Sequence, residues 1–186
     1  MVDRPDAPGP WVISSYTNTR VNGKADDNQV SFTPILQWQL AWSTKPGEAL
    51  WTGDLNPDGS GFVSGLNPGV TYYFWNRLRN EAGWSDLSAR TSIRMKSRPD
   101  APPPPSMISK DQDRVSLITR PNLEWHGASP VTSYELSYSL IPAFPDAGDI
   151  ITHGPQSIFH LFDLNPGFTY HFWSRTSNIY GTSEWS

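Results

Sequence analysis

The sequence contains no cysteine among its 186 residues. That absence excludes a disulfide framework, a thiolate metal site and a cysteine nucleophile. None of its asparagines lies in an N-x-Ser/Thr glycosylation sequon. Small modules secreted by animals are commonly held together by disulfides, so this composition favours a bacterial or viral source.

Positive charge is also scarce, since the formal net charge is -4 and no basic cluster occurs. Affinity for nucleic acid depends mainly on neutralising phosphates, so we expect no nucleic-acid partner. No apolar run approaches the length of about 18 residues that a membrane span needs, so no membrane insertion is expected. The first ten residues, MVDRPDAPGP, lack the apolar stretch of a secretory signal.

Aromatic residues, proline and glycine are plentiful instead: nine Trp, seven Tyr, eight Phe, 18 Pro and 14 Gly. Aromatic side chains suit the half-buried surface of a sheet, and proline and glycine interrupt helices. The composition therefore predicts an all-β protein built from many short strands.

Internal repetition defines the organisation of the chain. RPDAP occurs at Arg4–Pro8 and again at Arg98–Pro102, an offset of 94 residues. LNPG occurs at Leu66–Gly69 and at Leu164–Gly167, an offset of 98. Insertions that accumulate between strands are typical of loops, so the chain is two copies of one domain, over residues 1–97 and 98–186.

Alternating side chains locate the strands. Trp38, Leu40 and Trp42 alternate with polar or small neighbours, and Tyr72 and Phe74 alternate with the residues that follow them. Turn sequences such as Asn-Pro-Asp-Gly and Asn-Pro-Gly separate these runs. Several short strands at this spacing predict a β-sandwich in each copy.

The order of these motifs resembles the fibronectin type III family, which is an immunoglobulin-like β-sandwich. The matching positions run through the corner before the sixth strand and along that strand: Leu66, Pro68, Tyr72, Phe74, Asn80 and Gly83, then Leu164, Pro166, Tyr170, Phe172, Asn178 and Gly181. The resemblance implies that Tyr72 and Tyr170 are corner tyrosines, with each phenol bonded to nearby backbone.

The second strand departs from the family pattern, which has a core tryptophan there. The simplest register places Ala25 and Thr119 at that position. Two interpretations stay open for Phe32 and Trp125: they fill the gap in the core, or they project from the loop that follows.

Part of the chain is more specifically similar to repeats in minor tail proteins of phages that infect actinobacteria. Thr71–Arg77, Asn80–Ser85 and the RPDAP segments carry this resemblance. It implies a non-catalytic structural and adhesion module in the virion tail, which spaces or presents a host-contacting part. Its partners would be other tail proteins, or a protein or polysaccharide of the host cell surface. The alternative is an accessory segment of a secreted bacterial carbohydrate-active enzyme, which would be extracellular.

The ends of the sequence fit a longer array of repeats. Residues 1–3 resemble the end of a preceding repeat, and the second copy stops before its equivalent of Ala89–Arg94, the expected last strand. We expect the proline-rich segment at Pro99 and Pro102–Pro105 to form an extended, semi-rigid spacer.

No group of residues matches a catalytic, metal or cofactor site. The histidines His126, His153, His160 and His171 stand outside any nucleophile motif, and His160 and His171 are expected in different sheets. Asp54, Asn56 and Asp58 match half of a calcium loop but lack its bidentate glutamate, since position 65 is glycine. We interpret them as a tight turn, with calcium as the alternative.

Tryptophan and arginine alternate on the outer face of the sixth strand. We predict a structural ladder formed by Trp75, Arg77, Arg79, Trp173 and Arg175. Indole rings against guanidinium groups contribute about 0.5–2 kcal/mol each. Loop aromatics provide a second candidate surface, with candidate ligand contacts at Phe32, Trp84, Trp125 and Tyr180. The alternative, which we favour, is that the loop aromatics fill the core and the base of the loop.

Overall fold

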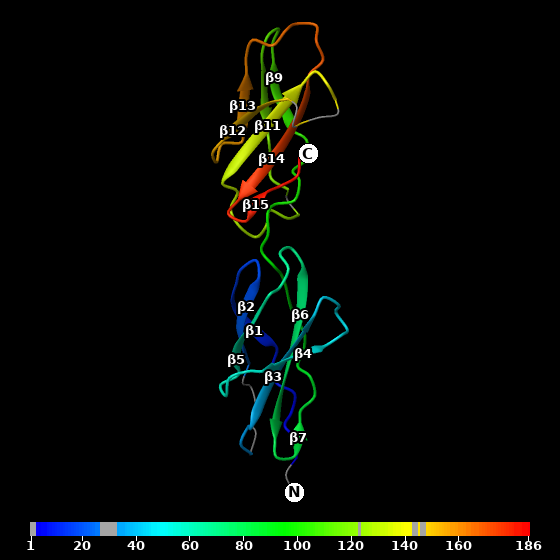
Figure 1. Cartoon of the computed structure of the whole chain (residues 1–186), viewed down its shortest axis with the longest axis vertical. Coiled ribbons are helices and arrows are strands. Elements are labelled where there is room, and N and C mark those ends of the chain that lie inside the picture. Colours follow the sequence, from blue (N-terminus) through cyan, green and yellow to red (C-terminus); the bar gives the residue numbers. More distant parts are fainter. Residues whose placement is uncertain (1–2, 27–32, 123, 143–144, 146–147) are drawn as a thin grey trace. The chain divides into compact units, whose positions relative to one another are not determined.

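A computed structural model describes residues 3–26, 33–122, 124–142, 145 and 148–186. Contacts divide the chain into two compact units, Met1–Lys96 and Ser97–Ser186, which we call unit 1 and unit 2. Unit 1 runs from blue to green in Figure 1, and unit 2 runs from green to red. No helix in the described ranges is long and apolar enough to cross a membrane.

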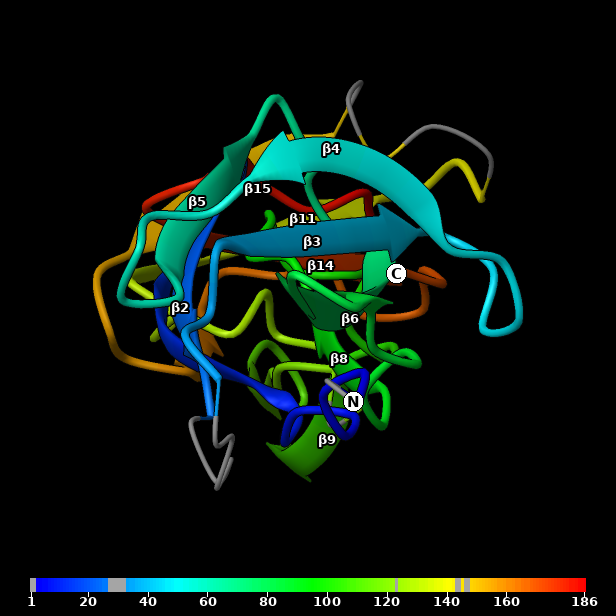
Figure 2. The same cartoon turned by 90° about the horizontal axis from the view of Figure 1, so that it is seen from below.

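Unit 1 consists of two antiparallel sheets. The first has the order β1-β2-β5, with strands at Trp11–Tyr16, Arg20–Ala25 and Ser60–Ser64. The second has the order β4-β3-β6-β7, and β8 also pairs with β6; its strands are Leu50–Asp54, Gln37–Ser43, Thr71–Asn80, Gly83–Trp84 and Thr91–Arg94. Figure 2 shows β4 and β5 next to each other, where the edges of the two sheets meet.

Unit 2 also consists of two antiparallel sheets, and in its described part the second sheet has four strands where that of unit 1 has five. One sheet has the order β13-β10-β9, with strands at Ile158–Leu161, Val115–Ile118 and Ser106–Lys110. The other has the order β12-β11-β14-β15, with strands at Asp149–His153, Ser133–Ser139, His171–Asn178 and Gly181–Thr182. Both units are immunoglobulin-like β-sandwiches, as predicted.

The core of unit 1 is centred on a tryptophan from the first strand. Trp11 on β1 is fully buried and packs against Phe74 on β6, with ring centroids 5.1 Å apart. Ala25 on β2 is also buried, next to this ring in the core cluster. The missing aromatic of the second strand is therefore supplied by Trp11, which sequence reasoning did not select. Phe32, one of the two residues considered for that position, lies outside the described residues.

Unit 2 lacks this tryptophan, because the repeat of RPDAP places Pro105 at the position of Trp11. Its core cluster is smaller and contains Phe159, which stacks on His153 at 4.5 Å. Thr119 is fully buried at the end of β10, and its hydroxyl has no hydrogen-bond partner among the described residues. Less apolar surface is buried here, which predicts a less stable unit.

The two RPDAP segments are packed parts of their own units. Pro5 and Pro8 are buried in unit 1, and Pro99 and Pro102 are buried in unit 2. The backbone N–H of Asp100 donates to the carbonyl of Trp125 at 3.2 Å, which ties the segment to unit 2. The extended, semi-rigid form expected of Pro99 and Pro102–Pro105 stays a prediction.

Candidate binding surfaces

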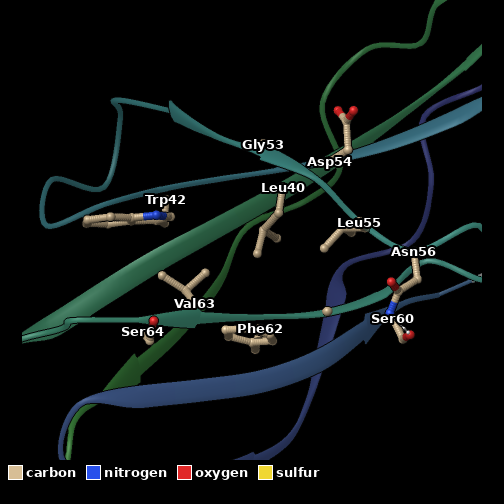
Figure 3. Close-up of a pocket in the computed structure, with 11 residues that line it drawn as sticks. Leu40, Trp42, Gly53, Asp54, Leu55, Asn56, Ser60, Phe62, Val63 and Ser64 are labelled. Carbon is tan, nitrogen blue, oxygen red and sulfur yellow. Dashed lines mark hydrogen bonds between the residues drawn. The ribbon is translucent and has the colours of Figure 1, made fainter.

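A groove opens in unit 1 between β4 and β5, the adjacent edge strands of its two sheets (Figure 3). We call it the unit 1 edge groove, and its volume is about 500 Å³. Leu40, Leu55 and Val63 form its apolar floor, and Trp42 lies at one end. The Trp42 indole N–H is buried and has no hydrogen-bond partner among the described residues. The groove combines an apolar floor with polar side chains at one end, which is the composition of many ligand sites.

Asp54 and Asn56 line the other end of this groove, and with Asp58 they belong to the turn for which calcium is the alternative. The Asp58 carboxylate accepts hydrogen bonds from the backbone N–H of Ser60 at 3.0 Å and from its hydroxyl at 2.6 Å. Asn56 donates to the same hydroxyl at 2.9 Å. The Asp54 carboxylate points away from Val63 in Figure 3 and accepts from Gln39 at 3.2 Å.

These contacts occupy Oδ1 of Asp58 and Oδ1 of Asp54. The Ser60 hydroxyl, followed by its backbone N–H, lowers the pKa of Asp58 below its ordinary value. No group of three or more His, Asp or Glu side chains in the described ranges is arranged to hold a metal ion. The turn accounts for the Asn-Pro-Asp-Gly sequence without an ion, and calcium stays the alternative.

The ladder on β6 is organised around Trp84 of β7. The Arg77 guanidinium lies 4.4 Å from the centre of the Trp84 ring, and that of Arg79 lies 5.8 Å away. Arg77 also donates two hydrogen bonds to the Gln39 side chain on β3, at 3.0 and 3.2 Å. Trp75, on the same face, is only 8% exposed. Three strands are thereby linked on one face of the sheet.

Unit 2 builds the same stack with a different tryptophan. Arg175 lies 4.3 Å from the centre of the Trp185 ring and forms an ion pair with Glu135 at 2.6 Å. Trp173 on the same strand is half-buried and lies 6.2 Å from the His171 ring. Glu135 occupies the position of the neutral Gln39. The contact between its carboxylate and the Arg175 guanidinium is charge-assisted and therefore stronger.

Paired serines align the two copies up to the last residue. The hydroxyls of Ser85 and Ser88 accept the backbone N–H groups of Leu78 and Asn76. Ser183 and Ser186 make the same contacts with Thr176 and Ser174, at 3.1 and 3.0 Å. Trp185 therefore corresponds to Leu87, not to Trp84. Arg77 and Arg175 occupy equivalent positions, and each contacts one tryptophan. The tryptophan is Trp84 in unit 1 and Trp185 in unit 2, and these two do not occupy equivalent positions.

Three of the four candidate contact aromatics are in the described residues, and each makes contacts within its own unit. The Trp125 indole N–H donates to the Ser97 hydroxyl at 2.7 Å, so this half-buried ring is anchored in unit 2. Tyr180 is half-buried in the tight turn between β14 and β15, and its backbone N–H donates to Asn178 at 2.8 Å. Trp84 belongs to the stack described above. Trp84 is in unit 1, and Trp125 and Tyr180 are in unit 2.

The two corner tyrosines make the same local bond but differ in burial. The Tyr72 hydroxyl accepts the backbone N–H of Asn67 at 3.0 Å, and the Tyr170 hydroxyl accepts that of Asn165 at 3.0 Å. Tyr72 is 3% exposed, whereas Tyr170 is half-buried.

The histidines are spread over unit 2. His160 on β13 contacts the Ser116 hydroxyl through Nδ1 at 2.8 Å, because the two residues are directly opposite on paired strands. His171 is on β14, in the other sheet. Both residues are on the exposed face of the sheet. Side chains directly opposite each other on one face of paired strands commonly interact in this way.

A second hollow, which sequence reasoning missed, lies in unit 2 beside Tyr138 and Tyr170. We call it the unit 2 edge groove, and its volume is about 450 Å³. Three large apolar side chains on its wall are exposed: Leu140 at 47%, Ile141 at 56% and Phe162 at 62%. Burial, followed by the charge of Asp149 across the strand pair, raises the pKa of Tyr138, so its phenol stays protonated and can donate.

The chain is similar to known proteins both in sequence and in structure. No protein-family model matches the chain. The chain is 27% identical to chicken Protein sidekick-2 over 199 residues, an alignment that covers 97% of this chain and 9% of that protein. The chain thus spans about a tenth of the length of this curated relative.

Two solved structures are similar over almost the whole chain. One is the crystal structure of chicken CNTN1 FN1-FN3 domains, with 14% identity, a TM-score of 0.45, and coverage of 99% of this chain and 97% of that one. The other is a two fibronectin type III domain segment from chicken tenascin, with 18% identity, a TM-score of 0.43 and the same coverage of each chain.

Proposed function

We propose that the chain is a non-catalytic structural and adhesion module that binds other proteins through exposed apolar surfaces on stiff β-sandwiches. The observation that carries this proposal is the unit 2 edge groove. Leu140, Ile141 and Phe162 are each about half exposed around one hollow. Clustered apolar side chains at a concave surface mark contact sites, because covering them removes apolar area from water at about 25 cal/mol per Å².

The framework beneath this surface suits a contact role. The Arg175 stack joins β11 to β14 and to the segment after β15, and the serine hydroxyls fasten that segment to β14. A rigid scaffold loses little conformational entropy on binding, so more of the apolar contact energy appears as affinity.

The more specific context is the tail of a phage that infects actinobacteria. The sequence similarity of Thr71–Arg77, Asn80–Ser85 and the RPDAP segments supports this proposal. The module would then be located in the virion and would contact tail proteins or a host-surface protein or polysaccharide. An antibody against the chain tests the location, because it should decorate tails of the phage in electron micrographs.

Binding is tested with the labelled chain and two matched variants. Phe162→Asp places a charge in the unit 2 edge groove, and Ile179→Asp places one at a turn residue that is 73% exposed. We expect Phe162→Asp to weaken binding to host cells or isolated tails about tenfold or more, since a buried phenylalanine contributes about 1.5–3 kcal/mol. Ile179→Asp should bind normally.

Equal binding by both variants would reject the unit 2 edge groove as the contact surface. Binding that is removed by soluble host polysaccharide, and not by purified tail or cell-surface protein, would favour the carbohydrate-associated alternative. Turnover of a polysaccharide or ester by the purified chain would contradict the non-catalytic proposal.

A further inference from the structure

The unit 1 edge groove has the size of a small-molecule site, and the proposed function does not use it. Its volume of about 500 Å³ lies within the range of about 300–1,000 Å³ that such sites occupy. It follows β5 from Ser60 to Ser64, a length of about 13 Å at the usual rise of a strand. An elongated groove of this size accepts a short chain of linked rings.

The polar side chains of the groove have unused hydrogen-bonding capacity. Asp54 accepts from Gln39 through Oδ1 at 3.2 Å, and its Oδ2 has no partner among the described residues. Asn56 donates to the Ser60 hydroxyl at 2.9 Å, and its side-chain oxygen has no partner in the same ranges. Ser64 is exposed. Carboxylate, amide and hydroxyl oxygens all accept hydrogen bonds, so the groove suits a ligand with several hydroxyl donors.

An aromatic ring lies at the opposite end from Asn56. The Trp42 ring is half-buried and is held by an edge contact with Tyr72, with centroids 5.5 Å apart and planes at 68°. Figure 3 shows this ring edge-on, with Val63 and Ser64 below its plane. A fixed indole provides a flat apolar surface for the C–H face of a sugar ring, while nearby polar groups bind the hydroxyls.

Charge limits the class of ligand further. Asp54 is the one charged side chain among the described residues that line the groove. Its carboxylate repels carboxylate or phosphate groups at short range, and the described lining offers no cation to balance them. The ligand that fits this lining is therefore neutral.

The β4 edge is poorly suited to an added peptide strand. The register between β3 and β4 shifts between Leu40 and Ala41, and Gly53 next to this shift has a φ of 133°. Such a bulge interrupts the ladder and twists the edge away from a pairing strand. Side-chain chemistry, rather than main-chain pairing, therefore determines the occupant.

A glycine keeps the groove open in unit 1. Gly53 is opposite Leu40, and a Cβ added to it would have nothing within 4 Å. In unit 2 the equivalent leucine, Leu136, is opposite Ile151, which packs against the core cluster. The position that is open in unit 1 thus carries a large apolar side chain in unit 2.

We propose that the unit 1 edge groove binds a neutral oligosaccharide. One sugar ring lies against Trp42 and Ser64, and a linked ring donates hydroxyl hydrogen bonds to Asp54 and Asn56. The proposal goes beyond the proposed function, which rests on the unit 2 edge groove, and it does not depend on that groove.

Amide NMR of the 186-residue chain, titrated in the presence of a chelator, is the direct test. The probes are the neutral trisaccharides maltotriose, cellotriose and mannotriose. We expect at least one to give saturable shifts confined to β4, β5 and Trp42, with no shifts in unit 2. Trigalacturonic acid, which carries carboxylates, should bind at least about tenfold more weakly than the best neutral probe because of Asp54.

Variants on the groove and away from it separate binding from folding. Asp54→Ala, at an exposed position, should weaken binding about tenfold, because a hydrogen bond to a charged acceptor is lost. Trp42→Leu, which stays apolar but removes the ring, should weaken it similarly. Asp86→Ala, exposed outside the groove, and Phe162→Asp, in unit 2, should bind normally. Melting temperatures show whether unit 1 of each variant is folded.

Three results would overturn the proposal. The first is the absence of saturable shifts with every trisaccharide up to its solubility limit. The second is an affinity that Asp54→Ala leaves unchanged, or shifts that lie outside the groove. The third is binding at β4 and β5 by a hexapeptide of alternating threonine and valine while the trisaccharides fail to bind, which would assign the groove to a peptide strand.

Discussion

Trp11 and Phe74 are in contact across the two sheets of unit 1, with ring centroids 5.1 Å apart and both side chains fully buried. The pair joins the first strand of one sheet to the central strand of the other. No equivalent pair exists among the described residues of unit 2, where Pro105 occupies the position of Trp11. The cluster of buried apolar residues is therefore larger in unit 1 than in unit 2.

Replacing Trp11 with alanine should destabilise unit 1 by about 3–5 kcal/mol, because it removes the largest buried side chain and leaves a cavity. Val12 on the same strand is 55% exposed and provides the control. Val12→Ala should change the free energy of unfolding by less than about 0.5 kcal/mol. Denaturant unfolding monitored by circular dichroism measures both variants.

Gly23→Ala should destabilise unit 1 by about 1–3 kcal/mol through overpacking. An added Cβ would lie 2.6 Å from the Val12 carbonyl oxygen and 2.8 Å from the Trp11 ring. Gly47 has nothing within 4 Å of the equivalent Cβ, so Gly47→Ala is the matched control. If both variants unfold at the same denaturant concentration, the packing of Trp11 on β2 is not as described.

Thr119→Val should stabilise unit 2 by about 1 kcal/mol, since it removes a buried hydroxyl without a partner in the described structure and keeps the side-chain shape. The backbone N–H of Thr119, which donates to Ser157 at 2.8 Å, is unaffected. A decrease in the melting temperature of unit 2 would show that the hydroxyl is satisfied in solution.

Asp58 should titrate below the ordinary range of an aspartate, because Ser60 donates two hydrogen bonds to its carboxylate. A lowered folded-state pKa stabilises the turn at pH values above the unfolded pKa, and this contribution is lost as the pH falls through the folded pKa. Ser60→Ala should move the pKa of Asp58 upward, as measured by carboxyl NMR. A calcium-dependent shift of the same signals would instead support the ion-binding alternative.

The two-domain organisation and many of the strands could be predicted from the sequence, because strands with one buried face have apolar residues at alternate positions. The repeats, the alternation of Trp38, Leu40 and Trp42, and the tyrosine corners all reflect strands with one buried face. The contact of Arg77 with Trp84 was not predicted, since the sequence analysis assigned Trp84 to the candidate ligand contacts.

Other features depend on tertiary position and leave no local signal. The β1 sequence WVISSY does not distinguish a core tryptophan from a surface one, so Trp11 was not chosen. The exposed set of Leu140, Ile141 and Phe162 comes from separate loops and becomes a surface only when the sheets fold together. The burial of Pro99 and Pro102 likewise depends on the sandwich against which they pack.

Solvent protection of the unit 2 edge groove during binding tests the contact function most directly. Hydroxyl-radical footprinting, read by mass spectrometry, compares the labelled chain alone with the chain bound to tails or host cells. We predict that Leu140, Ile141 and Phe162 become protected on binding, while Ile179 is modified at an unchanged rate. Binding that leaves these three side chains as reactive as in the free chain would contradict the assignment of the groove as the contact surface.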